Sequence, residues 1–179
     1  MPEHVLLSTV PGQPPLSRWI AQIDRKFMLF AWAKFSIVVA SGSLVTSVNI
    51  MVFDYYIAGE GVVNMGQAAI NAATNTHTQL QSIFPSLTPA QIWTMEGMTL
   101  LPGIDDLRKK TEVTYEPDAT TMLNFAQAPV PGSSMNFLSI WAIQRDNGGC
   151  PGTVDSNTCS GITQNDWDFS HILEPFTGP

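Results

Sequence analysis

The sequence predicts an α/β fold built around a parallel sheet, and two observations support this. Continuous apolar runs such as Val48–Phe53 are followed by polar residues, which is typical of strands buried on both faces. Between these runs lie segments with helix-compatible apolar spacing or a Ser/Thr/Glu-Pro start. Alternating strands and helices indicate right-handed crossovers between parallel strands.

The first forty residues predict one strand and one helix. His4–Thr9 is a short apolar run stopped by Pro11-Gly12, so we expect a strand that ends in a loop. Ser17–Ala40 mixes aromatic and aliphatic residues with charges at a spacing compatible with one apolar helix face.

The remaining elements follow from local start and stop signals. We expect helices over Asn64–Phe84, Thr88–Ile92 and Glu116–Gln127, and a short one from Asn165 to Glu174; Pro at the first helical position marks the second and third starts. We expect two further strands, over Trp93–Leu101 and Phe137–Ile143, with an acidic loop at Gly103–Leu107 after the first of them.

Composition restricts the classes of function. The chain has 179 residues, of which 44% are hydrophobic and 13% charged, which is typical of one globular domain. A net charge of −7 with only eight Lys and Arg argues against nucleic acid and anionic membrane surfaces as partners. Phe35–Phe53 is uncharged, but its Ser, Thr, Gly and Asn residues argue against a membrane span. No secretory signal opens the chain, so we expect a cytosolic protein or a missing N-terminus.

Two cysteines, Cys150 and Cys159, lie close together in a loop rich in Gly, Pro, Ser and Asn. In an oxidising compartment they would form a disulfide that closes a small surface loop; the alternative is two unpaired thiols. No CxxC pair accompanies them, and the three histidines lie on unrelated segments. We therefore expect no metal site and no cofactor.

Several ordered blocks of the sequence resemble glycoside hydrolase family 18, the family of many chitinases. The blocks are VNIMVFDYY (48–56), NAATNTHTQLQSIFPSLTPAQIW (71–93), MEGMTLLPGIDD (95–106), SIWAIQRDNGGCPG (139–152) and ITQNDWDFSHILEPF (162–176). The resemblance implies a partial TIM (β/α)8 barrel, roughly strands 5 or 6 to 8 with their helices. It assigns residues 44–179 to the C-terminal half of the catalytic barrel and leaves 1–43 as a poorly matching segment.

At the first matching strand, the resemblance implies a site around Asp54. The family pattern of Met, any residue, Tyr or Met, and Asp reads Met51-Val52-Phe53-Asp54 here. Asp54 would help position the substrate's N-acetyl group, and Met51 would shape the floor of the pocket. Phe53 has no hydroxyl, so a hydrogen bond that a Tyr makes there would pass to Tyr55 or be lost. We expect Asp54 and Tyr55 to be the catalytic residues.

At the last matching strand, the resemblance implies a sugar-binding surface around Trp141. Its indole would stack on the sugar at the cleavage point, and Arg145 and Asp146 would bond the sugar hydroxyls. Asp105 or Asp106, after the preceding strand, are weaker candidates. The implied ligand is chitin or a chitooligosaccharide, and the implied location is extracellular.

One part of the family's machinery is missing from this sequence. The family's general acid is a Glu that ends the motif Asp-x-x-Asp-x-Asp-x-Glu, and no such spacing occurs here. Two hypotheses remain: a chitinase-type hydrolase using substrate-assisted catalysis, or an inactive chitin-binding or vestigial fragment. We expect the isolated chain not to cleave chitin and, because an incomplete barrel leaves strand edges unpaired, to self-associate.

Overall fold

The computed structural model describes residues 35–36, 47–55, 63–105 and 111–178. The predicted strand at 4–9 and most of the predicted helix at 17–40 lie outside these ranges. At Phe35–Ser36 the prediction of a helix is wrong, because these two residues form strand β1. Their backbone pairs with Ile50 and Asn49, and this sheet pairing overrides the local helical spacing.

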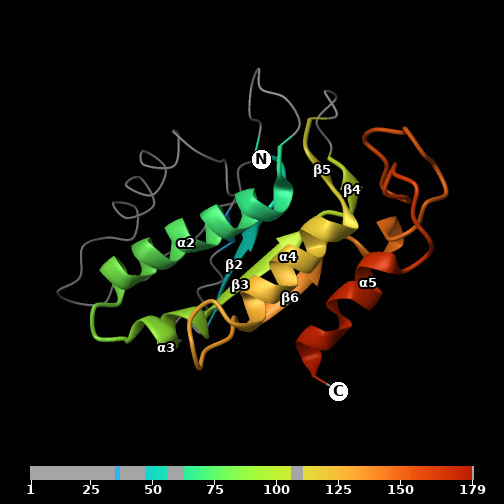
Figure 1. Ribbon diagram of the computed structural model, residues 1–179. Helices are drawn as coiled ribbons and strands as arrows, with labels where there is room; N and C mark the ends of the chain where they lie inside the picture. Colours follow the sequence, from blue (N-terminus) through green and yellow to red (C-terminus); the bar gives the residue numbers. More distant parts are fainter. Residues whose placement is uncertain (1–34, 37–46, 56–62, 106–110, 179) are drawn as a thin grey trace.

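The sheet has the order β1-β2-β3-β6, with β2 over Val48–Met51, β3 over Glu96–Leu100 and β6 over Phe137–Ile140. Strand β3 pairs in parallel with both β2 and β6, whereas β1 pairs antiparallel with β2 at one edge. The α/β class is therefore confirmed, with an antiparallel edge strand that the sequence did not predict. The fold is shown in Figure 1.

Two long helices cover one face of this sheet. Helices α2 (Met65–Ile83) and α4 (Glu116–Gln127) lie side by side in front of the strands in Figure 1, and α5 (Asp168–Leu173) packs against α4. None of the helices in the described ranges is long and apolar enough to cross a membrane. The arrangement is that of parallel strands connected by crossover helices.

Capping residues explain where the helices begin. The Asn64 side chain accepts a hydrogen bond from the Gln67 N–H at 2.8 Å and so starts α2. Helix α3 (Pro89–Trp93) starts with a capping box formed by Thr88 and Gln91. Trp93 thus ends a helix, and the predicted strand Trp93–Leu101 shortens to Glu96–Leu100.

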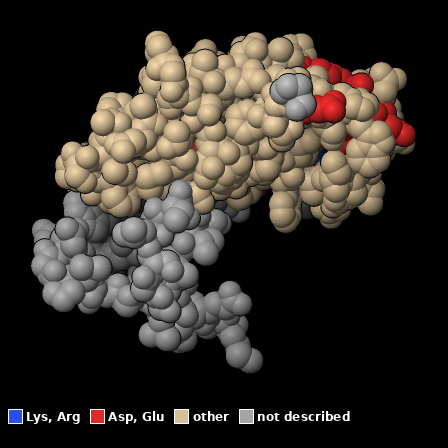
Figure 2. All heavy atoms as spheres, turned by 90° about the horizontal axis from the view of Figure 1, so that it is seen from below, with Lys and Arg blue, Asp and Glu red and all other residues tan. Residues whose placement is uncertain are grey.

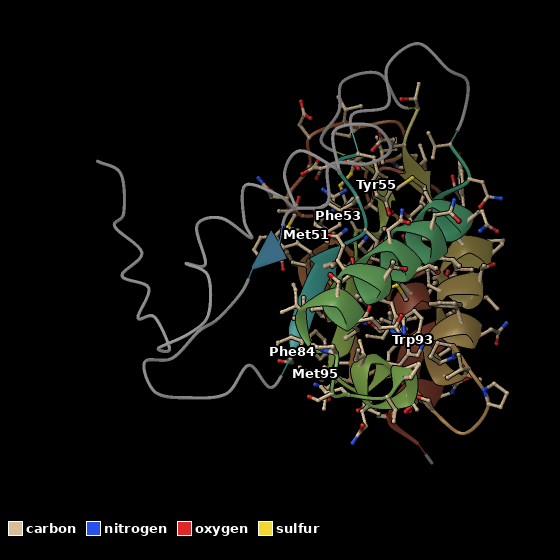
Figure 3. All side chains as sticks on the ribbon, turned by 90° about the vertical axis from the view of Figure 1, so that its left-hand side faces the viewer. Met51, Phe53, Tyr55, Phe84, Trp93 and Met95 are labelled. Carbon is tan, nitrogen blue, oxygen red and sulfur yellow. A yellow bond between two sulfur atoms is a disulfide. The ribbon has the colours of Figure 1, made fainter. Side chains whose placement is uncertain are left out.

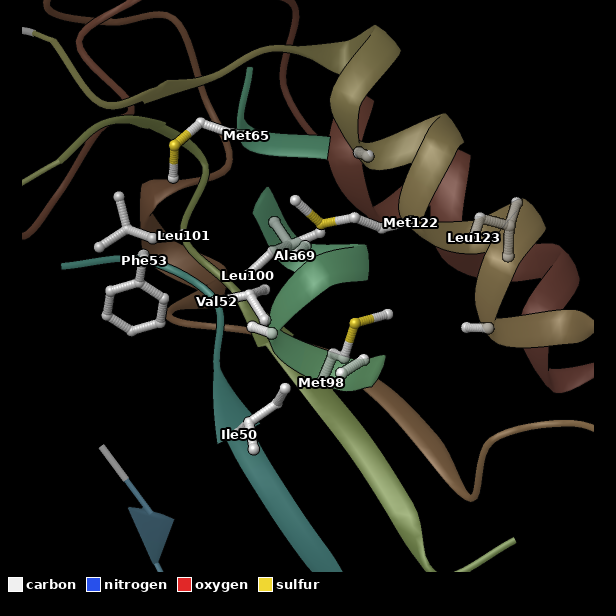
Figure 4. Packing of buried hydrophobic residues seen from close by; sticks show 14 of the residues in the cluster. Ile50, Val52, Phe53, Met65, Ala69, Met98, Leu100, Leu101, Met122 and Leu123 are labelled. Atoms are coloured by element: carbon white, nitrogen blue, oxygen red, sulfur yellow. The ribbon is translucent and has the colours of Figure 1, made fainter. Parts of the chain in front are cut away.

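The core lies between the sheet and the helices. Ile50 and Val52, from β2 and the residues just after it, and Met98 and Leu100 from β3 are all at most 1% exposed. They pack in one cluster with Ala69, Ala72 and Ala73 of α2 and with Met122 and Leu123 of α4. Figure 4 shows Ile50 and Val52 lying toward the helices and the Phe53 ring on the other side of its chain. The small alanines allow α2 to lie close to the strands.

The opposite face of the sheet has a row of hydrogen-bonded polar side chains, one from each parallel strand. The Asn49 amide donates to the Thr99 hydroxyl at 2.7 Å, and the hydroxyls of Thr99 and Ser139 lie 2.7 Å apart. We call Asn49, Thr99 and Ser139 the polar row. Beside it, a Cβ on Gly97 would collide with the ring of Phe137, so a larger residue here would require that ring to move.

A short hairpin follows β3 where the sequence predicted only the acidic loop Gly103–Leu107. Strand β4 (Gly103–Ile104) pairs antiparallel with β5 (Val113–Thr114). Gly103 has a φ of 76°, and a Cβ there would collide with the backbone of Ser160. The hairpin therefore lies directly against the loop that follows β6.

At the amino end of the sheet lies a buried pair of ionisable residues, His77 of α2 and Glu96 of β3. Their Nδ1 and Oε1 atoms are 2.8 Å apart, and the His77 ring stacks on Trp93 with centroids 4.0 Å apart. Burial raises the pKa of Glu96 to about 9 and lowers that of His77. Both directions favour a neutral pair in which the Glu96 hydroxyl donates to Nδ1. Figure 3 shows Trp93 among the helices, at the opposite end of the molecule from Tyr55.

Candidate functional site at the carboxyl end of the sheet

The parallel register brings Asp54 and Trp141 to the same edge of the sheet. Asp54 follows β2 by three residues, Trp141 directly follows β6, and β3 lies between these two strands. The Trp141 N–H donates to the Leu100 carbonyl at 2.8 Å, so the pairing with β3 extends to this residue. Carboxyl ends of parallel strands are the usual place for ligand sites in this fold class.

Two of the predicted substrate-binding residues lie on the face that carries the polar row. Side chains alternate along a strand, so Met51 shares a face with Asn49, and Trp141 shares one with Ser139. Trp141 is 59% exposed, more than any other large hydrophobic side chain in the described ranges. An exposed indole on a half-buried sheet face is suited to stacking against a flat apolar ligand face.

Asp54 lies at the end of β2 in a strained backbone conformation. Its φ is 55°, in the left-handed region that non-glycine residues seldom adopt. Its backbone N–H donates to Oδ2 of Asp105 at 2.7 Å, and its side chain is buried. Strain of this kind is held by surrounding contacts and is common at functional sites.

Tyr55 is placed differently from the sequence prediction. Its side chain is 1% exposed and belongs to the hydrophobic core, and its hydroxyl has no hydrogen-bond partner among the described residues. Burial, together with the charges of Glu112 and Asp105, raises the pKa of Tyr55 well above its ordinary value. Figure 3 shows Met51, Phe53 and Tyr55 following one another along the end of β2. In this structure the Tyr55 hydroxyl does not face an open ligand site.

Arg145 does not project into an open site either. It ends a short 3₁₀ helix, Ile143–Arg145, and is 2% exposed. Its guanidinium donates to the carbonyls of Ile104 at 2.7 Å and Pro102 at 3.2 Å, and to that of Ser156. The side chain therefore holds the β4–β5 hairpin and the following loop to the end of β6, instead of bonding a sugar as the sequence predicted.

Asp146 caps the start of helix α5, although it lies 23 residues before Phe169 in the sequence. It is fully buried, and its carboxylate accepts from the backbone N–H groups of Phe169 and Ser170 at 3.1 and 2.7 Å. It also accepts from the Ser170 hydroxyl and the Gln164 amide. These contacts satisfy backbone donors at the start of α5. In this conformation Asp146 has a structural role, whereas the sequence predicted contact with the ligand.

The loop after β6 is closed by a disulfide between Cys150 and Cys159, whose Cα atoms lie 6.0 Å apart. The structure thus selects the disulfide over the two free thiols. An open hollow of about 410 Å³ lies between this loop and the β4–β5 hairpin, and its lining includes Tyr115, Ile162 and Gly152. None of the predicted site residues lines it.

Glu112 is a buried residue of this region that the sequence analysis missed. It is 0% exposed, and its carboxylate accepts from the Tyr55 N–H at 2.7 Å. Asp105, a weaker candidate from the sequence, is 1% exposed and bonds the Asp54 N–H instead of facing a ligand site. Asp106 lies outside the described residues. Within the described ranges, no group of three His, Cys, Asp or Glu side chains is arranged to hold a metal ion.

The chain is similar to chitinases in both sequence and structure. The catalytic domain of a hyperthermophilic chitinase from Pyrococcus furiosus superposes with a TM-score of 0.64 at 31% identity, covering 76% of this chain and 41% of that domain. The chain is chitinase-like. This confirms the relationship that the sequence blocks predicted.

Two curated relatives are also chitinases by name. A probable bifunctional chitinase/lysozyme of Escherichia coli K12 is 33% identical over 147 residues, which is 77% of this chain and 16% of the relative. Endochitinase 11 of Metarhizium anisopliae is 32% identical over 113 residues, or 60% of this chain and 20% of the relative. No family model matches the chain. The chitinase-like chain thus spans a fifth or less of the curated relatives.

Proposed function

We propose that the described elements are the C-terminal part of a family 18 chitinase-type (β/α)8 barrel and hold the sugar during hydrolysis of chitin-type polymers. The main support is that Asp54 and the exposed Trp141 meet at one edge of a parallel sheet. Strands β2, β3 and β6 would then be barrel strands six, seven and eight, with residues 44–179 as the matching segment. A related Pyrococcus furiosus structure was determined with chito-oligosaccharides.

In this proposal the residues have separate roles. Trp141 stacks on the N-acetylglucosamine ring at the cleavage point, and Met51 forms part of the pocket floor. Asp54 orients the N-acetyl group, whose carbonyl oxygen attacks the anomeric carbon as the leaving-group oxygen is protonated. This substrate-assisted route needs a proton donor, and the Asp-x-x-Asp-x-Asp-x-Glu motif that supplies it in the family does not occur in this sequence.

The missing motif supports a second candidate function, binding without cleavage. Removing the general acid lowers the rate of a glycosidase by about 10²- to 10⁴-fold. The chain alone would then hold chitooligosaccharides and not hydrolyse them.

Two further features bear on location and assembly. The Cys150–Cys159 disulfide supports an oxidising, extracellular location. The outer edge of β6, which pairs with no strand of the described ranges, is the expected place for self-association.

A binding experiment with matched tryptophan variants tests the sugar site. Titration with chitotetraose, followed by calorimetry, should show binding to the wild-type chain and its loss in Trp141→Ala. The control is Trp167→Ala, because Trp167 is 48% exposed but lies at the start of α5, away from the sheet face. Equal affinities in the two variants would refute the assignment of Trp141.

A turnover assay separates the two candidate functions. We expect the purified chain not to release the fluorophore from a fluorogenic chitooligosaccharide that it binds. Sustained turnover that Trp141→Ala abolishes would contradict the binding-only function and would show that a proton donor exists outside the expected motif.

A further inference from the structure

We propose that Asp105 and Glu112, the two buried carboxylates that lie between strands β4 and β5 of the hairpin, are positioning residues that fix the backbone of Asp54 and Tyr55. This inference rests on the proposed sugar site, whose Asp54 they would orient. Neither residue touches the sugar in this proposal. Each acts through the chain segment that it holds.

The contacts are direct and buried. Oδ2 of Asp105 accepts from the Asp54 N–H, and Oε2 of Glu112 accepts from the Tyr55 N–H, both at 2.7 Å. The two acceptors are at most 1% exposed. Hydrogen bonds to charged acceptors are shorter and stronger than those between neutral groups, and burial increases their strength. Two consecutive backbone donors are therefore fixed by two separate side chains.

This pair of bonds falls where the backbone needs support. Strand β2 ends at Met51, and three residues later Asp54 adopts its left-handed φ of 55°. The hydrogen bonds of the β2–β3 ladder do not reach the N–H groups of Asp54 and Tyr55, which bond to the two carboxylates instead. The direction of the Asp54 side chain depends on this conformation, because φ determines where its Cβ points.

The hairpin itself is held firmly enough to serve as a support. The Asp105 N–H donates to the Glu112 carbonyl at 3.1 Å, and the Ile104 N–H to the Ser160 carbonyl at 2.8 Å. Arg145, four residues after Trp141, binds the carbonyls on both sides of Gly103. The hairpin thus connects the Trp141 end of the proposed site to the Asp54 end, and a shift at one end would be transmitted to the other.

Substitutions that keep or remove the accepting oxygen test this role. Asp105→Asn and Glu112→Gln keep an oxygen that can accept the backbone N–H, whereas Asp105→Ala and Glu112→Ala remove it. Glu96→Gln is the matched control, since Glu96 is equally buried but lies at the amino end of the sheet. All variants are made in the full chain, and their melting temperatures are measured first.

Two readouts follow on the folded variants. The first is the amide proton shift of Asp54 and Tyr55 by NMR, which reports the two hydrogen bonds without any ligand. The second is the affinity for chitotetraose. We expect Asp105→Ala to move the Asp54 amide resonance upfield and to weaken binding about tenfold, corresponding to about 1.4 kcal/mol. Asp105→Asn should restore most of the affinity, and Glu96→Gln should leave both readouts at wild-type values.

The results separate this inference from the proposed function. If the alanine variants keep wild-type amide shifts and affinity, or if Asn and Gln fail to restore what Ala loses, the positioning role is overturned. If the alanine variants do not fold, the Asn and Gln variants decide it: because both keep an accepting oxygen, Asp54 and Tyr55 amide shifts far upfield of the wild-type values in the folded Asn and Gln variants would overturn it. Failure of the wild-type chain to bind chitotetraose would refute the sugar site instead, while the amide shifts would still show whether the two carboxylates hold the backbone.

Discussion

The two ends of the sheet bury carboxyl groups in different ways. At the amino end, the Glu96 carboxyl group forms a hydrogen bond with the His77 side chain, and burial keeps it protonated. At the carboxyl end, Asp105, Glu112 and Asp146 each accept from backbone N–H groups. Backbone donors allow buried carboxylates to fix the path of the chain, whereas a single imidazole partner leaves Glu96 sensitive to pH. The end that contains the proposed site is therefore the end held by backbone bonds.

The surface also differs along the molecule. Figure 2, a view from below, shows acidic side chains gathered at one end of an otherwise largely uncharged surface.

The largest effect on stability is expected from Asp146→Ala. This change leaves the buried N–H of Phe169 and the partly buried N–H of Ser170 without their acceptor and should lower the free energy of unfolding by about 4 kcal/mol. Urea unfolding followed by circular dichroism measures it. The control Asp166→Ala removes an exposed carboxylate and should change stability by less than about 0.5 kcal/mol. Similar losses in both variants would show that backbone capping is not what Asp146 contributes.

Loss of the disulfide tests the same end of the sheet. Replacing Cys150 and Cys159 with serine should cost about 2 to 3 kcal/mol, because the unfolded chain regains the freedom of a short loop. The oxidised wild type and the double variant are compared by thermal unfolding. Since Arg145 bonds the Ser156 carbonyl inside this loop, the hairpin should also become more mobile. Faster amide exchange confined to the loop, with none in the hairpin, would contradict that connection.

The amino end of the sheet should make the free energy of unfolding depend on pH. The folded chain keeps the Glu96 proton up to about pH 9, whereas the unfolded chain loses it near the ordinary value of 4.5. Folding therefore binds a proton in this window, and stability should fall as pH rises, by about 1.4 kcal/mol per unit for this one group. Around pH 8, where His77 is neutral in both the folded and the unfolded chain, Glu96→Gln should remove this contribution. An unchanged slope in urea unfolding of the variant would show that Glu96 is ionised in the folded chain.

The smallest effect on stability is expected at the proposed site itself. Trp141 is 59% exposed, so Trp141→Ala should change the unfolding free energy by less than about 0.5 kcal/mol while abolishing chitotetraose binding. Thermal unfolding without ligand and calorimetry with ligand separate the two effects. A large loss of stability would indicate that the indole contributes to packing in the fold and is not simply exposed for ligand binding.

Elements with strong local signals were predictable. The expected helices at 64–84 and 116–127 agree with α2 and α4 to within one residue at each end, because Asn64 caps the first and Pro117 lies in the first turn of the second. The β4–β5 hairpin was not predictable, since two-residue strands have no periodicity. Trp93 was assigned to a strand because its apolar side chain precedes an apolar run. The sequence alone does not show whether such a residue ends a helix or begins a strand.

The site shows a similar division. That Asp54 and Trp141 share one edge follows from parallel strands, which the sequence predicted. That Arg145 and Asp146 turn inward does not follow, because charged residues after a strand have the same pattern whether they meet a ligand or a buried backbone group. The partners of Arg145 lie 11 to 43 positions away in sequence. Only the folded chain shows them.

The polar row has a consequence for how the strands align during folding. Asn49, Thr99 and Ser139 meet only when Asn49 lies opposite Gly97 and Thr99 opposite Ser139. A slip of one residue between β2 and β3 would turn Asn49 or Thr99 toward the apolar helices, leaving a buried polar group without its partner. The apolar face alone tolerates exchanges among residues of similar size. The polar row therefore penalises slips of one residue and favours the register that brings the ends of β2 and β6 level with each other.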